Sequence, residues 1–287
     1  SGTAITGVGF QPDFTWIKNR EVGTDQYLLF DAPRAATNYI SCDLDAAEVT
    51  AAESLKSFDA DGFTLGTNTV VNGSGNVNVC WNWNMGTASG ITTDGSTTIT
   101  PSAYSFNTTA GQSVIKYAGN TTAGAKVAHG CGATPSFILV KNLDTTNNWS
   151  GFHVAEGGTK SFSINSDAAI RTGLYWNDTN PDSVNITLGN NIETNTGYDY
   201  IAYCFAPVQG FSKFATYLGN GDTDGTFVYT GFRPALIIVK DIDSTESYAL
   251  FDNKRIGYNY NNWFLTPNDD RAEGESVYPD ILSNGFK

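Results

Sequence analysis

Charged residues are scarce in this sequence. They make up 16% of the 287 residues, against about a quarter in an average globular protein. Helix surfaces are usually built from charged, straight-chain residues, so this scarcity argues against a helical protein. Runs of about 18 apolar residues are also missing, so no membrane-spanning helix is expected. The first residues carry neither a basic nor an apolar stretch, so we expect no signal peptide.

Basic residues are outnumbered by acidic ones, 16 against 29, which gives a formal net charge of −13. A surface of this charge repels phosphate backbones and anionic lipid headgroups, so neither nucleic acid nor a membrane is an expected partner. The four cysteines, Cys42, Cys80, Cys131 and Cys204, form no metal-type pair. We expect buried thiols in a protein assembled under reducing conditions, with disulfides as the alternative, and no metal or cofactor.

An internal repeat is the main feature that the sequence does contain. A turn with Gly and Pro, an apolar run of strand length and a closing Lys occur three times, at residues 9–18, 132–141 and 231–240. Further segments recur in the same order: Phe30-Asp31, Phe152-His153 and Phe251-Asp252; Asp45-Ala-Ala, Asp167-Ala-Ala and Asp270-Arg-Ala; and the strands that carry Cys80 and Cys204. Coincidence at so many positions is very improbable, so the chain contains three copies of one unit.

The spacing of these segments predicts the fold class. Aromatic residues at 13% and 30 glycines favour strands joined by tight turns. Strands about 8–12 residues apart, with Asp-Gly and Asn-Gly turns between them, are typical of antiparallel β-sandwiches. We therefore predict an all-β chain of tandem sandwich units: unit 1 at residues 1–87, a linker strand with unit 2 at residues 88–207, and unit 3 at residues 208–287. The only helix expected is a short one at residues 45–55 and its counterparts.

The outer units are predicted to be incomplete. A strand at residues 113–120 opens unit 2 and recurs at residues 213–220 in unit 3, but unit 1 has no counterpart. The strand that carries Cys80 or Cys204 closes units 1 and 2, and unit 3 has none. An unpaired strand edge readily accepts a strand from elsewhere. We expect a longer array, or strands donated by neighbouring chains.

Several motifs of the chain form a recognisable set: Gly-x-x-Pro-x-Phe-x-x-x-Lys-Asn, Phe30-Asp31-x-x-Arg34, and residues 57–66, 203–214 and 219–234. Together they resemble a domain of unknown function that is repeated in structural proteins of marine bacteriophages. The resemblance covers nearly the whole chain and implies a lectin-like jelly-roll sandwich. It carries over no catalytic residue. It implies a place in the virion, in a tail fibre or another appendage.

The leading functional hypothesis is accordingly a phage virion structural or appendage protein, not an enzyme, whose tandem units form a rod with a role in host-surface adhesion. Its expected partners are further copies of itself or neighbouring virion proteins. Its expected location is the virion, outside the cell, after assembly in the host cytoplasm. The alternatives are a lectin-like module that binds a surface polysaccharide, and a polysaccharide depolymerase.

Four tryptophans are the candidate glycan-binding residues, because aromatic faces stack on sugar rings. Trp81 and Trp83 are two residues apart, so they share one face of a strand. Trp176 and Trp263 stand in segments rich in Asn and Asp. The competing interpretation is that these side chains belong to the core, where most aromatic residues of a sandwich lie.

Charged residues at equivalent positions also have a functional and a structural interpretation. Asp31 with Arg34 and Asp252 with Arg255 could clamp a ligand, but structural ion pairs are favoured. The acidic run Asp43-Leu-Asp45-Ala-Ala-Glu48 has a spacing that a glycosidase could use, although Asp45 also suits a helix N-cap. Three lysines that close the repeated strands are expected to be solvated or to protect sheet edges: Lys18, Lys141 and Lys240.

Overall fold

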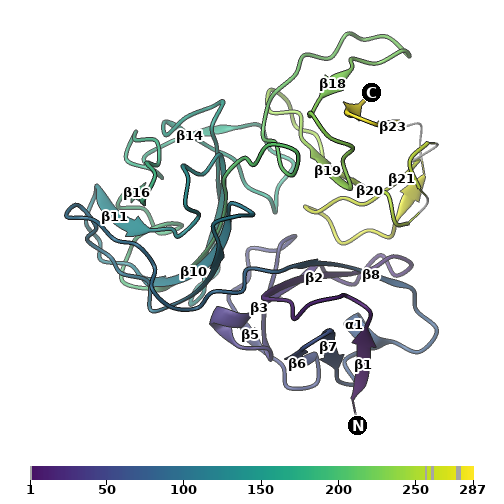
Figure 1. Ribbon diagram of the computed structural model, residues 1–287, viewed down its shortest axis with the longest axis horizontal. Helices are drawn as coiled ribbons and strands as arrows, with labels where there is room; N and C mark the ends of the chain where they lie inside the picture. Colours follow the sequence, from purple (N-terminus) through teal and green to yellow (C-terminus); the bar gives the residue numbers. More distant parts are fainter. Residues whose placement is uncertain (1, 256, 260–261, 276–278) are drawn as a thin grey trace.

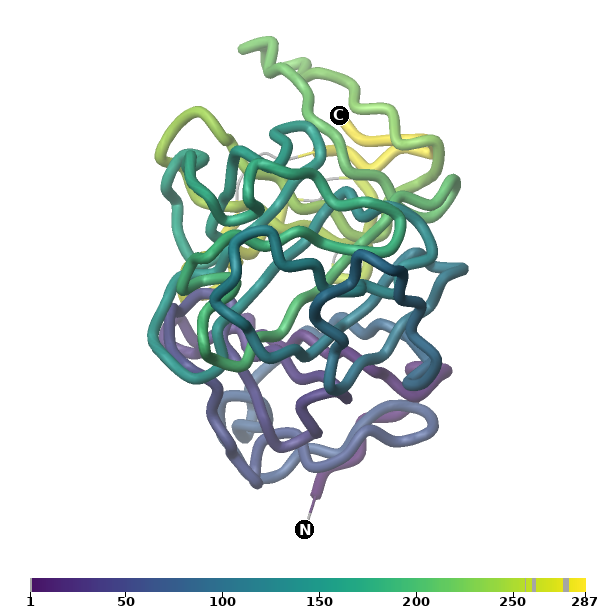
Figure 2. The backbone as a smooth tube through the Cα atoms, turned by 90° about the vertical axis from the view of Figure 1, so that its left-hand side faces the viewer, coloured from purple at the N-terminus to yellow at the C-terminus, as the bar shows by residue number. Residues whose placement is uncertain are grey.

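The computed structural model describes residues 2–255, 257–259, 262–275 and 279–287. Its regular secondary structure is almost entirely antiparallel β-sheet, so the predicted all-β, sandwich-like fold class is confirmed. Figure 1 shows three groups of strands, one for each repeat, arranged around a common centre. Figure 2, turned by 90°, places the N-terminus at the bottom and the C-terminal end near the top of the molecule.

Unit 1 is a sandwich of a five-stranded sheet, in the order β5-β4-β3-β2-β8, and a three-stranded sheet, β1-β7-β6. The only helical elements of the described residues are the one-turn segments η1 (Ala32–Arg34) and α1 (Thr69–Asn72). The strands of unit 1 are β1 (Thr3–Thr6), β2 (Phe14–Asn19), β3 (Leu28–Asp31), β4 (Asn38–Ser41), β5 (Val49–Thr50), β6 (Leu55–Asp59), β7 (Gly62–Leu65) and β8 (Asn78–Trp83).

Unit 2 repeats this plan with the sheet β13-β12-β17-β10-β9 and the pairs β11-β16 and β14-β15. Here β17 lies between β12 and β10 and bonds to both. The strands are β9 (Ala103–Asn107), β10 (Gln112–Ala118), β11 (Ala125–Ala128), β12 (Phe137–Asn142), β13 (Ser150–His153), β14 (Lys160–Ser161), β15 (Arg171–Thr172), β16 (Asn185–Leu188) and β17 (Asp199–Phe205).

Unit 3 is reduced. Its principal sheet, as far as the described residues show, is the pair β19-β20, accompanied by β18-β24-β23 and β21-β22. The strand predicted at residues 213–220 is not formed, and this segment runs as a loop ahead of β18, at the upper right of Figure 1. The strands are β18 (Val228–Tyr229), β19 (Leu236–Val239), β20 (Ala249–Asp252), β21 (Trp263–Phe264), β22 (Gly274–Glu275), β23 (Ile281–Leu282) and β24 (Gly285–Phe286).

In units 1 and 2 the repeated apolar strand is buried on both of its faces, which explains its continuous run of apolar residues. Neighbouring residues of a strand point to opposite faces. In unit 2, Ile138 and Val140 therefore face the core of that unit, whereas Leu139 faces a second core. In unit 1, Ile17 and Trp16 are divided in the same way.

The second core is shared by all three units. It contains Trp16, Tyr27 and Ile40 from unit 1, with many further side chains from the other units. The contributions of unit 2 include Leu139, Trp149 and Tyr203, and those of unit 3 are Tyr248, Leu250 and Leu265. The units are therefore packed around one apolar centre. They do not form the predicted rod.

Backbone hydrogen bonds close this arrangement into a ring. Each unit contributes an extended strap, at residues 43–50, 165–172 and 268–275, that lies against the lysine loop of the next unit, at residues 141–149, 240–248 and 18–27. One bond of each contact is equivalent in all three: Glu48 N–H to Leu143 O at 2.9 Å, Ile170 N–H to Ile242 O at 3.0 Å, and Glu273 N–H to Arg20 O at 2.8 Å. The straps occupy the place of the predicted helix at residues 45–55, which is not formed.

Because one core stabilises all three units, we predict that they unfold in a single cooperative transition. Leu139→Ala, which empties a shared-core position, should cost about 2–4 kcal/mol and destabilise units 1 and 3 together with unit 2. Denaturant titration, followed by hydrogen exchange resolved by unit, measures this. Val77→Ala, at a side chain 45% exposed, is the control. Separate transitions, or destabilisation confined to unit 2, would contradict a shared core.

Candidate functional site

The Asp31–Arg34 pair lies fully buried where unit 1 meets unit 2. The carboxylate and the guanidinium approach to 2.6 Å, and Arg34 also donates to the carbonyl of Leu29. Tyr203 of unit 2 donates its hydroxyl to Asp31 at 2.6 Å, and Glu48 stands 3.4 Å from Arg34. Burial by itself disfavours the charged guanidinium, but the adjacent Asp31 carboxylate outweighs it and raises the pKa of Arg34.

The Asp252–Arg255 pair repeats this arrangement in unit 3, with 2.7 Å between the charged groups. Arg255 also bonds to Glu273, and Trp81 of unit 1 donates its indole N–H to Asp252 at 3.2 Å. Each pair thus takes a hydrogen bond from the last strand of another unit. This geometry joins units to one another and leaves no free charge for a ligand.

In unit 2, none of the three charged residues that form this ion-pair network in units 1 and 3 is present. The positions of Asp31, Arg34 and Glu48 are occupied there by His153, Glu156 and Ile170. The glutamates Glu48 and Glu273 are members that the sequence reasoning did not assign. The signal that could have found them is this joint presence in units 1 and 3 and joint replacement in unit 2.

For two of the three repeated lysines, Lys18 and Lys141, the prediction of solvated strand ends was wrong, whereas Lys240 is partly exposed and donates only to carbonyls of its own loop. Lys18 and Lys141 are fully buried. Lys18 donates to the carbonyl of Asp270 in the strap of unit 3 at 2.9 Å, and Lys141 donates to the carbonyl of Asp45 in the strap of unit 1 at 3.1 Å. Burial lowers the pKa of Lys141 to about 8. An ammonium group can replace its lost hydration with several carbonyl oxygens. One of these comes from the neighbouring unit, and the others come from the loop that follows the lysine in its own unit.

Asp43 is the one carboxylate of the acidic run with a strongly altered proton affinity. It is 7% exposed, and its Oδ1 accepts the N–H of Tyr27 at 2.9 Å, while Oδ2 has no hydrogen-bond partner. Burial raises its pKa from 3.8 to about 6. Glu48 is engaged with Arg34. These two side chains make contacts within unit 1, whereas the backbone of Asp45 and Glu48 forms the hydrogen bonds to unit 2.

Three of the four candidate tryptophans pack against cores. Trp176 is 1% exposed and meets Phe152 edge-on in the core of unit 2. Trp81 and Trp83 lie partly buried against the shared core, and Trp83 stacks on Phe14 with 4.5 Å between ring centroids. Trp263 alone of the four is exposed, at 38%, and the guanidinium of Arg20 lies 5.9 Å from its ring.

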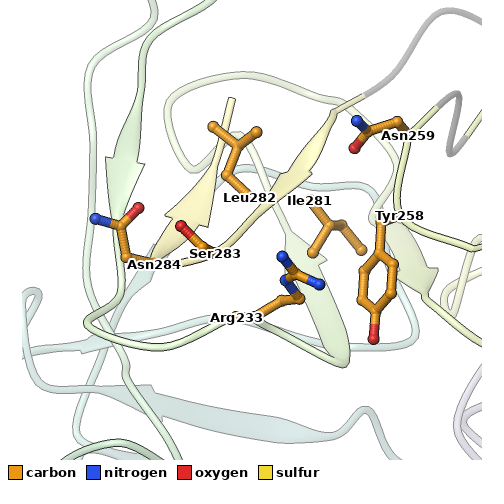
Figure 3. A pocket seen from close by; sticks show the side chains of 7 residues that line it. All are labelled: Arg233, Tyr258, Asn259, Ile281, Leu282, Ser283 and Asn284. Carbon is orange, nitrogen blue, oxygen red and sulfur yellow. The ribbon is translucent and has the colours of Figure 1, made fainter.

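A surface pocket of about 470 Å³ opens in unit 3. Arg233 and Tyr258 lie next to one another in its wall, as Figure 3 shows. The guanidinium is 4.6 Å from the centroid of the tyrosine ring. The remaining wall is formed by Asn259, Asn284 and the side chains of β23 and the turn after it. An aromatic ring, a cation and two amides are groups that can hold hydroxyl-rich ligands. The sequence reasoning missed this pocket, because its walls come from segments about 50 residues apart.

The remaining chemistry of the described residues is limited. The four cysteines are free thiols, and three of them are buried. Within the described ranges no cluster of three or more His, Cys, Asp or Glu side chains could hold a metal ion. Over the same residues, no helix has the length and apolar character needed to cross a membrane.

Fold and sites together define an all-β protein of three sandwich-like units with buried polar contacts between them. A family model described as a domain of unknown function, DUF7483, matches residues 1–287, and the chain belongs to that family. This one match covers all three repeats. No curated protein and no solved structure matches the chain.

Removing one partner of a buried ion pair leaves an uncompensated charge. We therefore predict that Arg34→Met costs about 3–5 kcal/mol of unfolding free energy, and that adding Asp31→Leu recovers part of this loss. Chemical denaturation measures both. Lys56→Met, in a pair that is exposed on both sides, is the control and should leave the midpoint unchanged. Equal effects of Arg34→Met and Lys56→Met would contradict a structural role for the buried pair.

Asp43 should make stability depend on pH. The folded protein holds this proton more tightly than the unfolded chain, so the contribution is present below about pH 4 and is lost as the pH rises to about 6. Asp43→Asn keeps an acceptor for Tyr27 and cannot ionise. Between pH 4 and 7 the wild type should lose on the order of 2 kcal/mol relative to this variant. Parallel stability curves for the two proteins would refute the assignment.

Proposed function

We propose that this chain is a structural component of a phage virion, in a tail fibre or a similar appendage, with a role in host-surface adhesion and no enzymatic activity. The sequence motifs shared with structural proteins of marine bacteriophages suggest this setting. The closed ring of three sandwiches is the structural observation that supports it best. A particle part that bears load benefits from units that cannot separate, and here the shared core and buried ion pairs join them.

The proposed setting agrees with the chemistry of the chain. Free thiols suit assembly in the reducing cytoplasm of the host, before the virion reaches the exterior. The net charge of −13 favours solubility and disfavours contact with nucleic acid. Further copies of the chain or neighbouring virion proteins are the proposed partners. A depolymerase is not proposed, because in the acidic run that prompted it Asp43 is buried and Glu48 is paired with Arg34.

Immunogold electron microscopy tests this placement. Antibodies against residues 1–287 should label a defined appendage on intact virions of the phage that encodes the chain. Antibodies against a nonstructural protein of the same phage are the control and should not label the particles. Abundant chain in infected cells together with unlabelled particles would overturn the proposal.

A lectin-like role in carbohydrate binding is the second candidate, and the pocket of unit 3 favours it. Its Arg233, Tyr258, Asn259 and Asn284 offer hydrogen bonds and an aromatic edge to a sugar. The exposed ring of Trp263 is the other surface on which a pyranose could stack. Trp81, Trp83 and Trp176 are not retained as contacts, because they pack against the cores.

A glycan array distinguishes these two surfaces. Tyr258→Ala should abolish binding if the pocket holds the sugar, whereas Trp263→Ala should do so if the indole face holds it. Phe211→Ala removes an aromatic ring that is more exposed than either, 56% against 40% for Tyr258 and 38% for Trp263, and should change nothing. Binding that survives both of the first two substitutions would exclude these two surfaces, and an array without signal would remove the lectin role.

A further inference from the structure

The apolar strand of unit 3 has an unpaired edge that the other two units cover. In unit 1, β2 lies between β3 and β8, and in unit 2, β12 lies between β13 and β17. Among the described residues, β19 of unit 3 pairs with β20 alone. The second edge of β19 is thus open, whereas the equivalent edge of β2 is paired with β8 and that of β12 with β17.

Exposure of apolar side chains marks the same place. Ile238 of β19 is 39% exposed, whereas its equivalents Trp16 and Leu139 are 5% and 7% exposed. The segment expected on the other side of the unfilled strand position contains Tyr217. This side chain is 45% exposed, whereas its equivalent Tyr117 in β10 is fully buried. In unit 2 the strand between these two rows is β17. The segment that contains Tyr217 does not form its predicted strand, which is expected if the partner between it and β19 is absent.

The contacts between the units predict which side chain a strand paired with the open edge of β19 must carry. Tyr203 pairs with Leu139 and donates to Asp31 of unit 1, and Trp81 pairs with Trp16 and donates to Asp252 of unit 3. If unit 3 contacts unit 2 in the same way, the residue opposite Ile238 would point to the position in unit 2 that is equivalent to Asp31.

That equivalent is His153. Its Nδ1 accepts the N–H of Ala155 at 3.2 Å, so Nε2 carries the proton, and no described residue accepts from it. A tyrosine hydroxyl opposite Ile238 can act as the acceptor. The two carboxylates of the ring thus receive a hydrogen bond, whereas the histidine would donate one.

We propose that the open edge of β19 is a docking site for one antiparallel strand donated by a partner polypeptide, with apolar residues in the alternation of β17 and a tyrosine opposite Ile238. A folded second copy does not suit this place. The incoming strand must bond on both edges, and β17 is already paired on both sides, while β8 is held by β2. The occupant is therefore an extended segment that becomes ordered on binding.

A synthetic peptide with the sequence of residues 198–206 and Cys204→Ser provides the test, with residues 1–287 as the protein. It should bind one-to-one and saturably, and it should slow hydrogen exchange in β19 and in residues 213–219. The same peptide with Ala202→Pro is the matched control, because proline removes a ladder N–H. Absence of saturable binding up to about 1 mM, or equal binding of both peptides, would overturn the proposal. Concentration-dependent dimerisation that protects β19 without any peptide would also overturn it, in favour of a second copy.

A double-mutant cycle tests the register. Tyr203→Phe in the peptide removes the hydroxyl and should weaken binding about fivefold. With the protein variant His153→Phe, the two peptides should bind equally, because the hydroxyl has lost its partner. A fivefold difference that persists in the His153→Phe protein would show that the strand docks in another register.

Discussion

The whole structure depends on a strand that is buried on both faces. In β2 and β12, alternate side chains fill the core of their own unit and the core shared by all three. Such a strand cannot remain in a separate sandwich, because half of its apolar side chains would then meet water. Packing of the units around one centre follows from that constraint.

Burial of the strand has an electrostatic consequence at its end. The closing lysines enter the interior with the strand, and an ammonium group there needs oxygen acceptors. For Lys18 and Lys141 these include backbone carbonyls of another unit's strap. A buried ammonium group that would destabilise an isolated unit is thereby hydrogen-bonded to another unit, and this contact helps to close the ring. The buried Asp–Arg pairs act in the same way, since Tyr203 and Trp81 reach them from other units.

The ring is made from repeats but is not symmetric. Unit 2 has His153, Glu156 and Ile170 where the other units have an ion-pair network. Unit 3 has an open edge beside Ile238, where the other units have β8 and β17. Both departures concern the contact between units 3 and 2, because the side chain opposite Ile238 would reach His153. The histidine is thus the only member of its set without a described hydrogen bond from another unit.

The sequence by itself determined the all-β class, the threefold repeat and the residues of the ion pairs, because turns, strand periodicity and recurrence are local patterns. Only the tertiary structure decided that the units close into a ring and that Lys18, Lys141 and Trp176 are buried. It also decided that residues 45–55 form a strap and that Arg233 and Tyr258 meet at a pocket. These properties depend on which surface of a neighbouring unit covers each side chain. A pattern within one segment carries no information about that distant surface.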